Sequence, residues 1–463
     1  MGVATPRTRI ALRPGKWHRG HMSTRILFLS LILTLVTPRV FADTVKDREG
    51  AVRKDKTAVL EKDGRWLYND IEAGFAAAKK AGKPLLVVLR CVPCMSCMGL
   101  DAGVLEDKGL ESLLGQFVCL RVINANALDL SRFQFDYDLS LTTMIFNGDG
   151  TVYGRFGSWK HQKDAQEKAT ASFKAALEGA LTLHKGYPGN KESLAGKQGS
   201  PSPYKSPLEI PGLDGKYTKE LDWQGKVVQS CVHCHQIGDA LRATLREQKK
   251  PITDDLIFPQ PQPETIGLTL AEDSAARISA VAEGSPAAAA GIKPGDDLLI
   301  LENQPLISSA DVSWVLHRAP ASGSLKAVVK RSGTATVLPV QLPAGWRQKA
   351  DISRRTGTWD MRGMTTGGLV LEDVPDAERA GLSLAKDALG LRVKFVGQYN
   401  KHAAAKNAGW QKDDILVEIA GLTARLSEGA LMGHLLQEHF PGESLKATVL
   451  RGGKKVTLPL PMQ

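Results

Sequence analysis

The sequence predicts a multidomain protein in which an α/β unit comes first and mainly-β units close the chain. Three continuous apolar runs of strand length lie among helix-like stretches in residues 59–187, which is the pattern of an α/β unit. After residue 258 the chain changes to short strands with one helix, and this pattern occurs twice. At roughly 150 residues per domain, 463 residues have room for about three domains.

The composition excludes several classes of protein. Hydrophobic residues make up 43% and charged residues 24%, as in folded globular chains, so a chain disordered throughout, a multi-span membrane protein and a coiled-coil rod are excluded. The net charge of +11 comes mostly from residues 1–42, which hold seven basic residues and no acid. Subtracting those seven from the 60 basic residues leaves 53 against 49 acidic residues. No basic cluster in the remainder predicts nucleic-acid binding.

Residues 1–42 have the pattern of a signal peptide. The apolar run Ile26–Val36 follows a basic stretch and is shorter than the about 20 residues that span a bilayer. Val40 and Ala42 put small residues at the −3 and −1 positions of a cleavage site, and Met22 is an alternative start. We expect export, to the periplasm or an equivalent compartment that permits disulfides. An uncleaved anchor is the alternative, and membrane attachment is expected only in that case.

The α/β unit, residues 59–187, contains these elements in order. Trp66–Gly82 is amphipathic and predicts a helix, and a second helix is expected over Lys163–His184. Three strands are expected between them, at Pro84–Leu89, Phe117–Ile123 and Thr142–Phe146.

The rest of the chain divides by composition. Residues 188–219, rich in Gly, Pro, Ser and Lys, are expected to be a linker, and residues 220–250 form a short helical segment. The two mainly-β units are expected at 258–345 and 365–462. Their repeat is visible in Ala290–Leu298 against Ala408–Ile415, with Gly291 and Gly409 offset by 118 positions.

Three cysteines at spacing three follow the first apolar strand: Cys91, Cys94 and Cys97. A helix that begins there offers free N–H groups and the positive end of its dipole, which favour a thiolate over a thiol. Cys119 lies inside the second apolar run, so we expect it to be a core residue.

This region resembles the thioredoxin fold, with the lead-in Lys83–Val87. The resemblance implies that Cys94 attacks a disulfide and Cys97 resolves it. Cys91-Val92-Pro93-Cys94 is an alternative register, with Cys91 as a third participant. Two positions depart from the family: Val88 replaces the usual acidic residue, and Thr142 replaces the proline that faces the cysteines. Metal capture by these thiols, or cysteines without chemistry, are the alternatives.

A second motif, Cys231-Val232-His233-Cys234-His235, has the CxxCH spacing of covalent c-type haem attachment. In that chemistry Cys231 and Cys234 add to the haem vinyl groups and His235 ligates the iron. About 30 residues surround the motif, too few for a complete cytochrome core, so other domains would have to cover the haem. The alternatives are a zinc site that uses the same three residues, and a second dithiol or plain disulfide.

The repeated mainly-β unit resembles the PDZ domain in the circular permutation of bacterial exported proteins. The resemblance rests on Glu283–Ala288, Ala290-Gly291 and Lys293–Asp296. It implies that protein C-termini or extended peptides bind by adding a strand to the sheet edge. The residues implied to hold the terminal carboxylate are Ile266, Gly267 and Leu268 in the first copy, and Leu389, Gly390 and Leu391 in the second. The second copy lacks the Gly of the Pro-Gly-Asp turn, and a packing module without ligand is the alternative for it.

The whole arrangement resembles the bacterial thioredoxin-7/PDZ domain-containing (seleno)protein family. The resemblance implies an exported redox protein with a thioredoxin-like domain, a short helical CxxCH segment with haem c, two PDZ domains, and a redox partner protein. No Gly-x-Ser-x-Gly context occurs, so a protease is not expected, and the enzyme class indicated is a thiol–disulfide oxidoreductase. The alternative is a non-catalytic PDZ scaffold whose cysteines are structural or bind metal.

Overall fold

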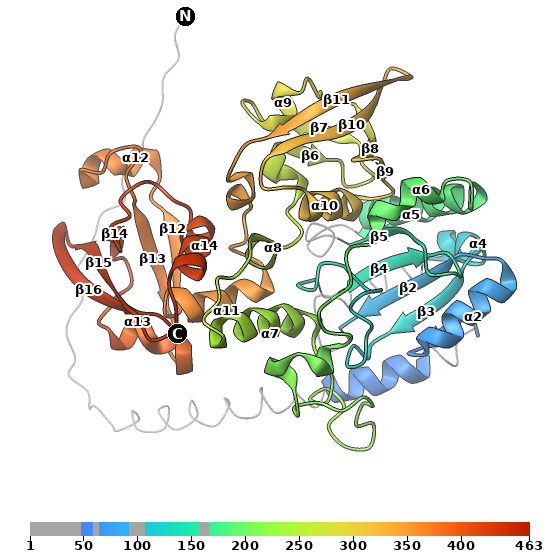
Figure 1. The fold of residues 1–463 in the computed structure, drawn as a ribbon, viewed down its shortest axis with the longest axis horizontal. Helices are drawn as coiled ribbons and strands as arrows, with labels where there is room; N and C mark the ends of the chain where they lie inside the picture. Colours follow the sequence, from blue (N-terminus) through green and yellow to red (C-terminus); the bar gives the residue numbers. More distant parts are fainter. Residues whose placement is uncertain (1–47, 59–63, 92–106, 140, 158–165) are drawn as a thin grey trace, which may run out of the picture. The chain divides into compact units, whose positions relative to one another are not determined.

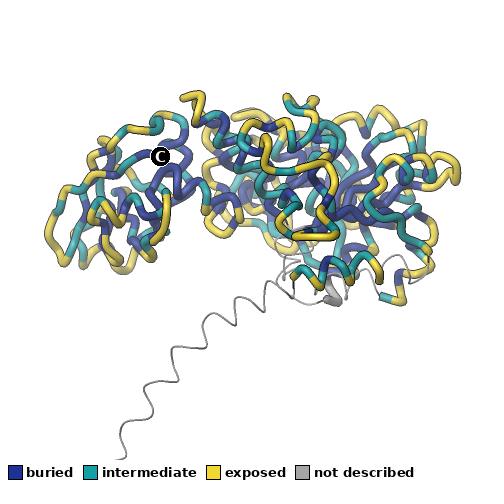
Figure 2. Tube along the Cα trace, turned by 90° about the horizontal axis from the view of Figure 1, so that it is seen from below, coloured by how far each residue is buried: buried dark blue, intermediate teal, exposed yellow. Residues whose placement is uncertain are grey.

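The computed structural model describes residues 48–58, 64–91, 107–139, 141–157 and 166–463 (Figure 1). Residues 48–463 form one compact unit, and buried backbone runs through each of its domains (Figure 2). Among the described residues, none of the helices is both long and apolar enough to span a bilayer. The predicted signal peptide, residues 1–42, lies outside the described residues, and so do Cys94 and Cys97.

The first domain is built on a five-stranded sheet with the order β1-β3-β2-β4-β5. The strands β1, β3 and β2 are parallel, β4 runs antiparallel to them, and β5 runs antiparallel to β4. The strand bounds are β1 (Trp66–Tyr68), β2 (Leu85–Arg90), β3 (Val118–Val122), β4 (Leu141–Phe146) and β5 (Val152–Phe156). The three predicted strands are therefore present, with β1 and β5 in addition.

Helices cover both faces of this sheet because its central strand is apolar on both sides. In β2, Leu85, Val87 and Leu89 pack in one core cluster with α2 (Ile71–Ala81), while Leu86 and Val88 pack in another with α5 (Gln166–Lys185). Asp70 caps α2 by accepting a hydrogen bond from Ala73 N at 2.9 Å. Smaller helices complete this region, at η3 (Lys108–Leu110), α4 (Glu111–Leu114) and residues 48–58.

The stretch expected to be a linker, 188–219, is instead folded onto the domain. Its side chains Leu194, Lys197 and Ile210 are at most 1% exposed, since the segment lies between neighbouring domains. It contains α6 (Lys191–Leu194), η4 (Ala195–Lys197), η5 (Pro207–Glu209) and η6 (Pro211–Leu213). The CxxCH segment follows with α7 (Cys234–Glu247), and α8 (Asp254–Ile257) leads to the β-rich half.

The first β unit has a four-stranded sheet, β11-β10-β8-β9, and a separate pair, β6-β7. Its core extends past the predicted boundary at residue 345, because Trp346 is fully buried in the same cluster. Its elements are η7 (Pro263–Ile266), β6 (Leu268–Leu270), β7 (Ile278–Val281), α9 (Pro286–Ala289), β8 (Asp297–Leu301), β9 (Gln304–Pro305), α10 (Ser309–Arg318), β10 (Gly323–Arg331), β11 (Thr334–Leu342) and η8 (Trp346–Lys349).

The second β unit has a five-stranded sheet in the order β12-β13-β14-β15-β16. It is preceded by α11 (Thr356–Thr365). Its elements are β12 (Leu369–Asp373), α12 (Asp376–Arg379), η9 (Ala380–Leu382), β13 (Leu391–Val396), η10 (Asn400–Ala403), α13 (Ala404–Asn407), β14 (Ile415–Ile419), α14 (Glu428–Glu438), β15 (Ser444–Arg451) and β16 (Lys454–Pro461).

The same local contact occurs within each of the two units, which supports the repeat predicted from sequence. Arg331 binds Asp296 at 2.7 Å and the carbonyl of Gly291 at 2.9 Å. Arg451 binds Asp414 and the carbonyl of Gly409 at the same two distances.

The second unit also compensates for the glycine missing from its turn. Asp413 has φ 69° at the position where Gly295 has φ 90° in the first unit. Aspartate tolerates this left-handed conformation better than most residues, so the turn survives without glycine.

Candidate functional site

Cys91 directly follows the carboxyl end of β2, the central strand of the five-stranded sheet. All six residues of β2 are buried, which fixes the position of this end. Thr142, the predicted substitute for proline, lies in β4 opposite Leu89, two residues before Cys91. The sulfur of Cys91 is 3.1 Å from Nδ1 of His233. A thiol predicted from one motif therefore contacts the histidine inside the other.

His233 is held at the N-terminus of α7, where it is the capping residue. Its N–H donates to Oε1 of Gln236 at 2.8 Å, and the Gln236 side chain in turn donates to the hydroxyl of Tyr217 at 3.0 Å. These bonds fix the backbone of His233 at the start of α7, from where its ring reaches Cys91.

Cys231 lies against the end of the neighbouring strand. Its thiol donates to the carbonyl of Ile123, just beyond β3, at 3.3 Å. Burial raises the pKa of Cys231 to about 11, so the reduced side chain is a thiol near neutral pH.

Cys234, the first residue of α7, packs against the apolar cluster that covers the α2 face of the sheet. Burial, and then the negative charge of a Cys231 thiolate, raise the pKa of Cys234 to about 12. That second effect requires the two thiols to be near neighbours.

Asn126 anchors this segment to the first domain, and no pattern in the sequence indicated it. It is fully buried. Its Oδ1 accepts from Val232 N at 2.7 Å, and its Nδ2 donates to the carbonyls of Thr218 and Ser230 at 2.7 and 2.8 Å. The backbone on both sides of Cys231 is thus bound by one amide.

A cluster of buried charged side chains lies at the ends of β2 and β3. Asp55 pairs with Arg90 at 3.0 Å and with Arg121, and accepts from the hydroxyl of Tyr68 at 3.1 Å. The sequence showed that the first strand lacks its usual acid. The structure brings a buried carboxylate to Arg90, the residue before Cys91, from the helix at residues 48–58.

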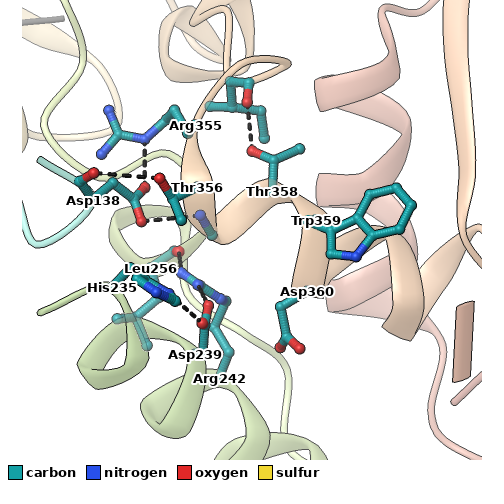
Figure 3. A network of polar contacts seen from close by, with 12 residues as sticks. Asp138, His235, Asp239, Arg242, Leu256, Arg355, Thr356, Thr358, Trp359 and Asp360 are labelled. Carbon is teal, nitrogen blue, oxygen red and sulfur yellow. Dashed lines mark hydrogen bonds and ion pairs between the residues drawn. The ribbon is translucent and has the colours of Figure 1, made fainter. Parts of the chain in front are cut away.

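His235 belongs to a different polar network (Figure 3). Its Nδ1 lies 3.1 Å from Oδ2 of Asp239, which also accepts from Arg242 at 2.6 Å. Burial lowers the pKa of His235, but the hydrogen bond and charge of Asp239 outweigh it, so the net pKa is raised. Arg242 donates onward to the carbonyl of Leu256 at 3.0 Å.

Cys231, Cys234 and His235 have the donor atoms that haem attachment uses. Asp239 contacts His235 at Nδ1, as carboxylates behind metal-binding histidines do. The thiols of Cys231 and Cys234, however, face the first domain. Two clefts of about 860 and 450 Å³ lie in the described part of the chain, and neither is lined by these three residues. Haem c attachment therefore stays a prediction from the motif.

Zinc is the other predicted metal. Among the described residues, no group of three or more His, Cys, Asp or Glu side chains is arranged to hold a metal ion. Cys119 is fully buried and its thiol faces the carbonyl of Leu114 at 3.7 Å, which confirms that it is a core residue.

The predicted carboxylate loop of the first β unit lies directly before β6. Ile266 and Leu268 are buried in the core, and Gly267 has φ 88°. A Cβ at Gly267 would overlap Ser285, so the close approach requires glycine there.

In the second β unit, Leu389 and Gly390 precede β13 and Leu391 is its first residue, so a carboxylate-binding role for these three residues stays a prediction. The strand β12 comes before them in the chain and has its own glycine-containing entry. Gly368 has φ 87°, and its carbonyl accepts from Gly397 N just as the Gly267 carbonyl accepts from Ala282 N. Residues 366–369 thus lead into β12 much as residues 265–268 lead into β6.

A buried carboxylate binds the backbone of β12. Leu371 N donates to Oε1 of Glu428 at 2.8 Å, and Glu428 comes from α14. Arg362 of α11 pairs with the same carboxylate at 2.6 Å, and both side chains are at most 8% exposed. A backbone N–H of β12 is therefore already bound within the chain itself.

Comparison with known families supports two of the domains. Residues 66–148 match the family described as thioredoxin-like, and residues 255–330 match the PDZ domain. The chain contains a thioredoxin-like domain and a PDZ domain. The thioredoxin-like match ends within the sheet, between β4 and β5, and the PDZ match covers the first β unit as far as β10.

Similar solved structures include two of the HtrA-type protease AlgW, each with a decapeptide, one of them a variant. Both are 19% identical with a TM-score of 0.20, and the matches cover 30% and 37% of this chain. The chain spans 40% and 46% of the length of those structures. A comparison with curated proteins found no match.

Proposed function

We propose that this protein is a thiol–disulfide redox protein whose PDZ domain holds the partner protein. The thioredoxin-like and PDZ domains indicate a redox-type module with a protein-binding module. The observation that supports thiol–disulfide chemistry is the contact at 3.1 Å between Cys91 Sγ and His233 Nδ1, at the end of β2.

Disulfide exchange needs a thiolate at Cys91, and the imidazole of His233 accepts the thiol proton. His233 takes the proton of Cys91, and the thiolate attacks one sulfur of a disulfide in the partner. A Cys91–partner disulfide forms, the partner's disulfide breaks, and the leaving thiolate takes the proton from the imidazolium. A second thiol of the Cys91, Cys94, Cys97 group then resolves the mixed disulfide. This favours the register that begins at Cys91, with Cys94 as its pair.

The test measures how fast the full chain exchanges with a small aromatic disulfide, which is followed through the absorbance of the aromatic thiol that is released. We expect Cys91→Ser to slow exchange by at least about 100-fold, because the attacking atom is removed. Cys119→Ala is the matched control, since that thiol is buried in the core and should change the rate little. Equal rates for the Cys91→Ser variant and the unmodified chain would contradict the proposal.

The PDZ domain is proposed to bind a free C-terminus through residues 265–268. The N–H groups of such a loop recognise a terminal carboxylate, and the peptide adds a strand to β6. Fluorescence anisotropy with a labelled peptide that ends in valine should show binding at least about tenfold weaker when that carboxylate is amidated. Equal affinity for both peptides would exclude carboxylate recognition.

Export remains part of the proposal. Its support is the basic, apolar and small-residue pattern of residues 1–42. An oxidising compartment is where a redox protein meets protein disulfides as partners. The scaffold alternative, with cysteines that do no chemistry, predicts no effect of Cys91→Ser on exchange.

A further inference from the structure

We infer that Cys231 and Cys234 form a second redox-active pair, which exchanges its disulfide directly with the thioredoxin-like site through Cys91. This inference rests on the proposed function and adds a reaction within the chain. It assigns a role to the CxxCH segment that needs neither haem nor zinc.

The first support is the position of the two sulfurs on the sheet. Leu89 of β2 lies opposite Val122 of β3 in parallel register, so Cys91 and Ile123 lie just beyond the same end of neighbouring strands. Adjacent strands are about 4.8 Å apart. Because Cys231 Sγ contacts the Ile123 carbonyl at 3.3 Å, Cys231 and Cys91 approach the same edge of the sheet.

The second support is the position of His233 between the CxxCH cysteines and Cys91. It lies between Cys231 and Cys234 in sequence, and its ring contacts the sulfur of Cys91. A residue of the CxxCH segment that touches one partner and is flanked by the other two brings all three sulfurs into one region.

The third support is the strength of the anchoring. Asn126 makes three hydrogen bonds to the backbone at 218, 230 and 232, and Tyr217 holds Gln236 next to His233. A segment used only as a spacer between domains would not need a fully buried amide to fix the residues beside Cys231.

The exchange balances without an external oxidant. Starting from a Cys231–Cys234 disulfide and a reduced thioredoxin-like site, the Cys91 thiolate attacks Sγ of Cys231. The Cys91–Cys231 bond forms, the Cys231–Cys234 bond breaks, and the Cys234 thiolate takes the proton that His233 received from Cys91. A second thiol of the thioredoxin-like motif resolves the mixed disulfide. Two electrons thereby pass from that motif to the CxxCH pair, and the reverse sequence returns them.

The test traps the intermediate in the full chain. Cys234→Ser, combined with Cys94→Ser and Cys97→Ser, removes the thiol that completes the CxxCH pair and the thiols that would resolve the mixed disulfide. Mild oxidation with oxidised glutathione should then accumulate a Cys91–Cys231 disulfide, seen as one linked peptide by mass spectrometry without reduction. Cys234→Ala is a second trapping variant, and melting temperatures show that each variant folds. Cys119→Ala should give no new link, and adding Cys91→Ser should abolish the link.

The outcomes separate this inference from the proposed function. A trapped Cys91–Cys231 link supports it. If the link is missing while the chain still exchanges with the aromatic disulfide, this inference fails and the proposed function stands. If that exchange is also independent of Cys91, both fail. A covalent haem spectrum in the denatured chain, lost in Cys231→Ala, or tightly bound zinc would overturn this inference alone.

Discussion

At the scale of single residues, the most unusual charge arrangement is at Arg355, where two buried carboxylates share one guanidinium. Arg355 Nε donates to Asp138 at 2.9 Å, and the same guanidinium pairs with Asp136. Asp138 also accepts from Gly357 N at 3.0 Å, whereas Oδ2 of Asp136 is buried without a partner among the described residues. Burial, opposed by Arg355 and reinforced by Asp138, raises the pKa of Asp136 to about 6.

This pKa predicts how stability depends on pH. The folded pKa, about 6, lies above the ordinary 3.8, so the folded state holds more protons between these values. The contribution of Asp136 is therefore present below pH 3.8 and is lost as pH rises through about 6. We expect Asp136→Asn to raise the melting temperature at pH 7.5 and to change it little at pH 4, with a gain of at most about 3 kcal/mol.

Asp138→Asn is the contrast for this prediction. It weakens acceptors for both Arg355 and Gly357, so it should destabilise the chain at both pH values. Thermal unfolding of the three proteins at the two pH values makes the comparison. If Asp136→Asn had the same effect at both pH values, the raised pKa would be wrong.

Single residues also show where sequence reasoning succeeds and where it ends. Motif spacing identified Cys91, Cys231 and Gly267, because local backbone chemistry fixes what those positions need. It could not identify Asn126 or Asp55, since their partners are distant in the chain: Asn126 and Val232 are 106 residues apart. A buried amide or carboxylate leaves no local pattern, and only the fold shows what it binds.

At the scale of elements, the second β unit uses its helix α14 for packing within the chain. Gly429 and Gly433 bring α14 close to Ile352 and Phe258, so chain segments outside the unit cover this helix. On the same helix, Glu428 joins α14 to β12 through Leu371 N. These contacts favour the packing-module alternative that the sequence left open for this unit.

Removing the Glu428 carboxylate should be costly. Glu428→Ala leaves Arg362 buried without its partner and Leu371 N without an acceptor, so we expect a loss of about 3–5 kcal/mol. Hydrogen–deuterium exchange should show faster exchange at the β12 amides, with a lower melting temperature. Glu378→Ala, which breaks the more exposed pair with Arg392, should cost far less. Unchanged hydrogen–deuterium exchange at β12 in Glu428→Ala would show that this contact does not stabilise β12.

Elements were predictable where apolar periodicity decides them and not where tertiary contacts do. The three central strands follow from continuous apolar runs. The folded stretch at 188–219 reads as a linker because its short helices depend on burial between domains; Lys197, for example, is 1% exposed. A Leu-Gly-Leu triplet carries too little information to choose between the starts of β12 and β13, so the loop of the second unit could not be placed from sequence.

At the scale of the whole molecule, the PDZ domain is docked onto the thioredoxin-like domain through a polar and apolar interface. Ile307 of the PDZ domain packs in the core cluster of the thioredoxin-like domain. Asp311 of α10 accepts from Lys197 at 2.7 Å and from Arg155 N at 3.0 Å. The Arg155 guanidinium lies 3.7 Å from the ring centre of Trp314, also on α10. A partner protein bound by the PDZ domain would thus be held at a fixed position relative to the thioredoxin-like domain.

This docking predicts a measurable loss when Asp311 is removed. Lys197 and Asp311 are 1% and 2% exposed, and burial lowers the pKa of Lys197 while Asp311 opposes that shift. Asp311→Ala leaves this lysine, and the backbone N–H groups of Arg155 and Ile307, without their acceptor. We expect the interface to lose about 3–5 kcal/mol, so the two domains should separate before either unfolds.

Limited proteolysis and calorimetry of the full chain test this. Asp311→Ala should expose cleavage sites in residues 188–219 and replace one unfolding transition by two. Asp296→Ala is the matched control, because its carboxylate is equally buried but pairs with Arg331 inside the PDZ domain. It should weaken that domain without exposing residues 188–219, since none of its contacts crosses to the thioredoxin-like domain. If both variants behaved alike, the Asp311 contacts would stabilise the PDZ domain rather than its docking.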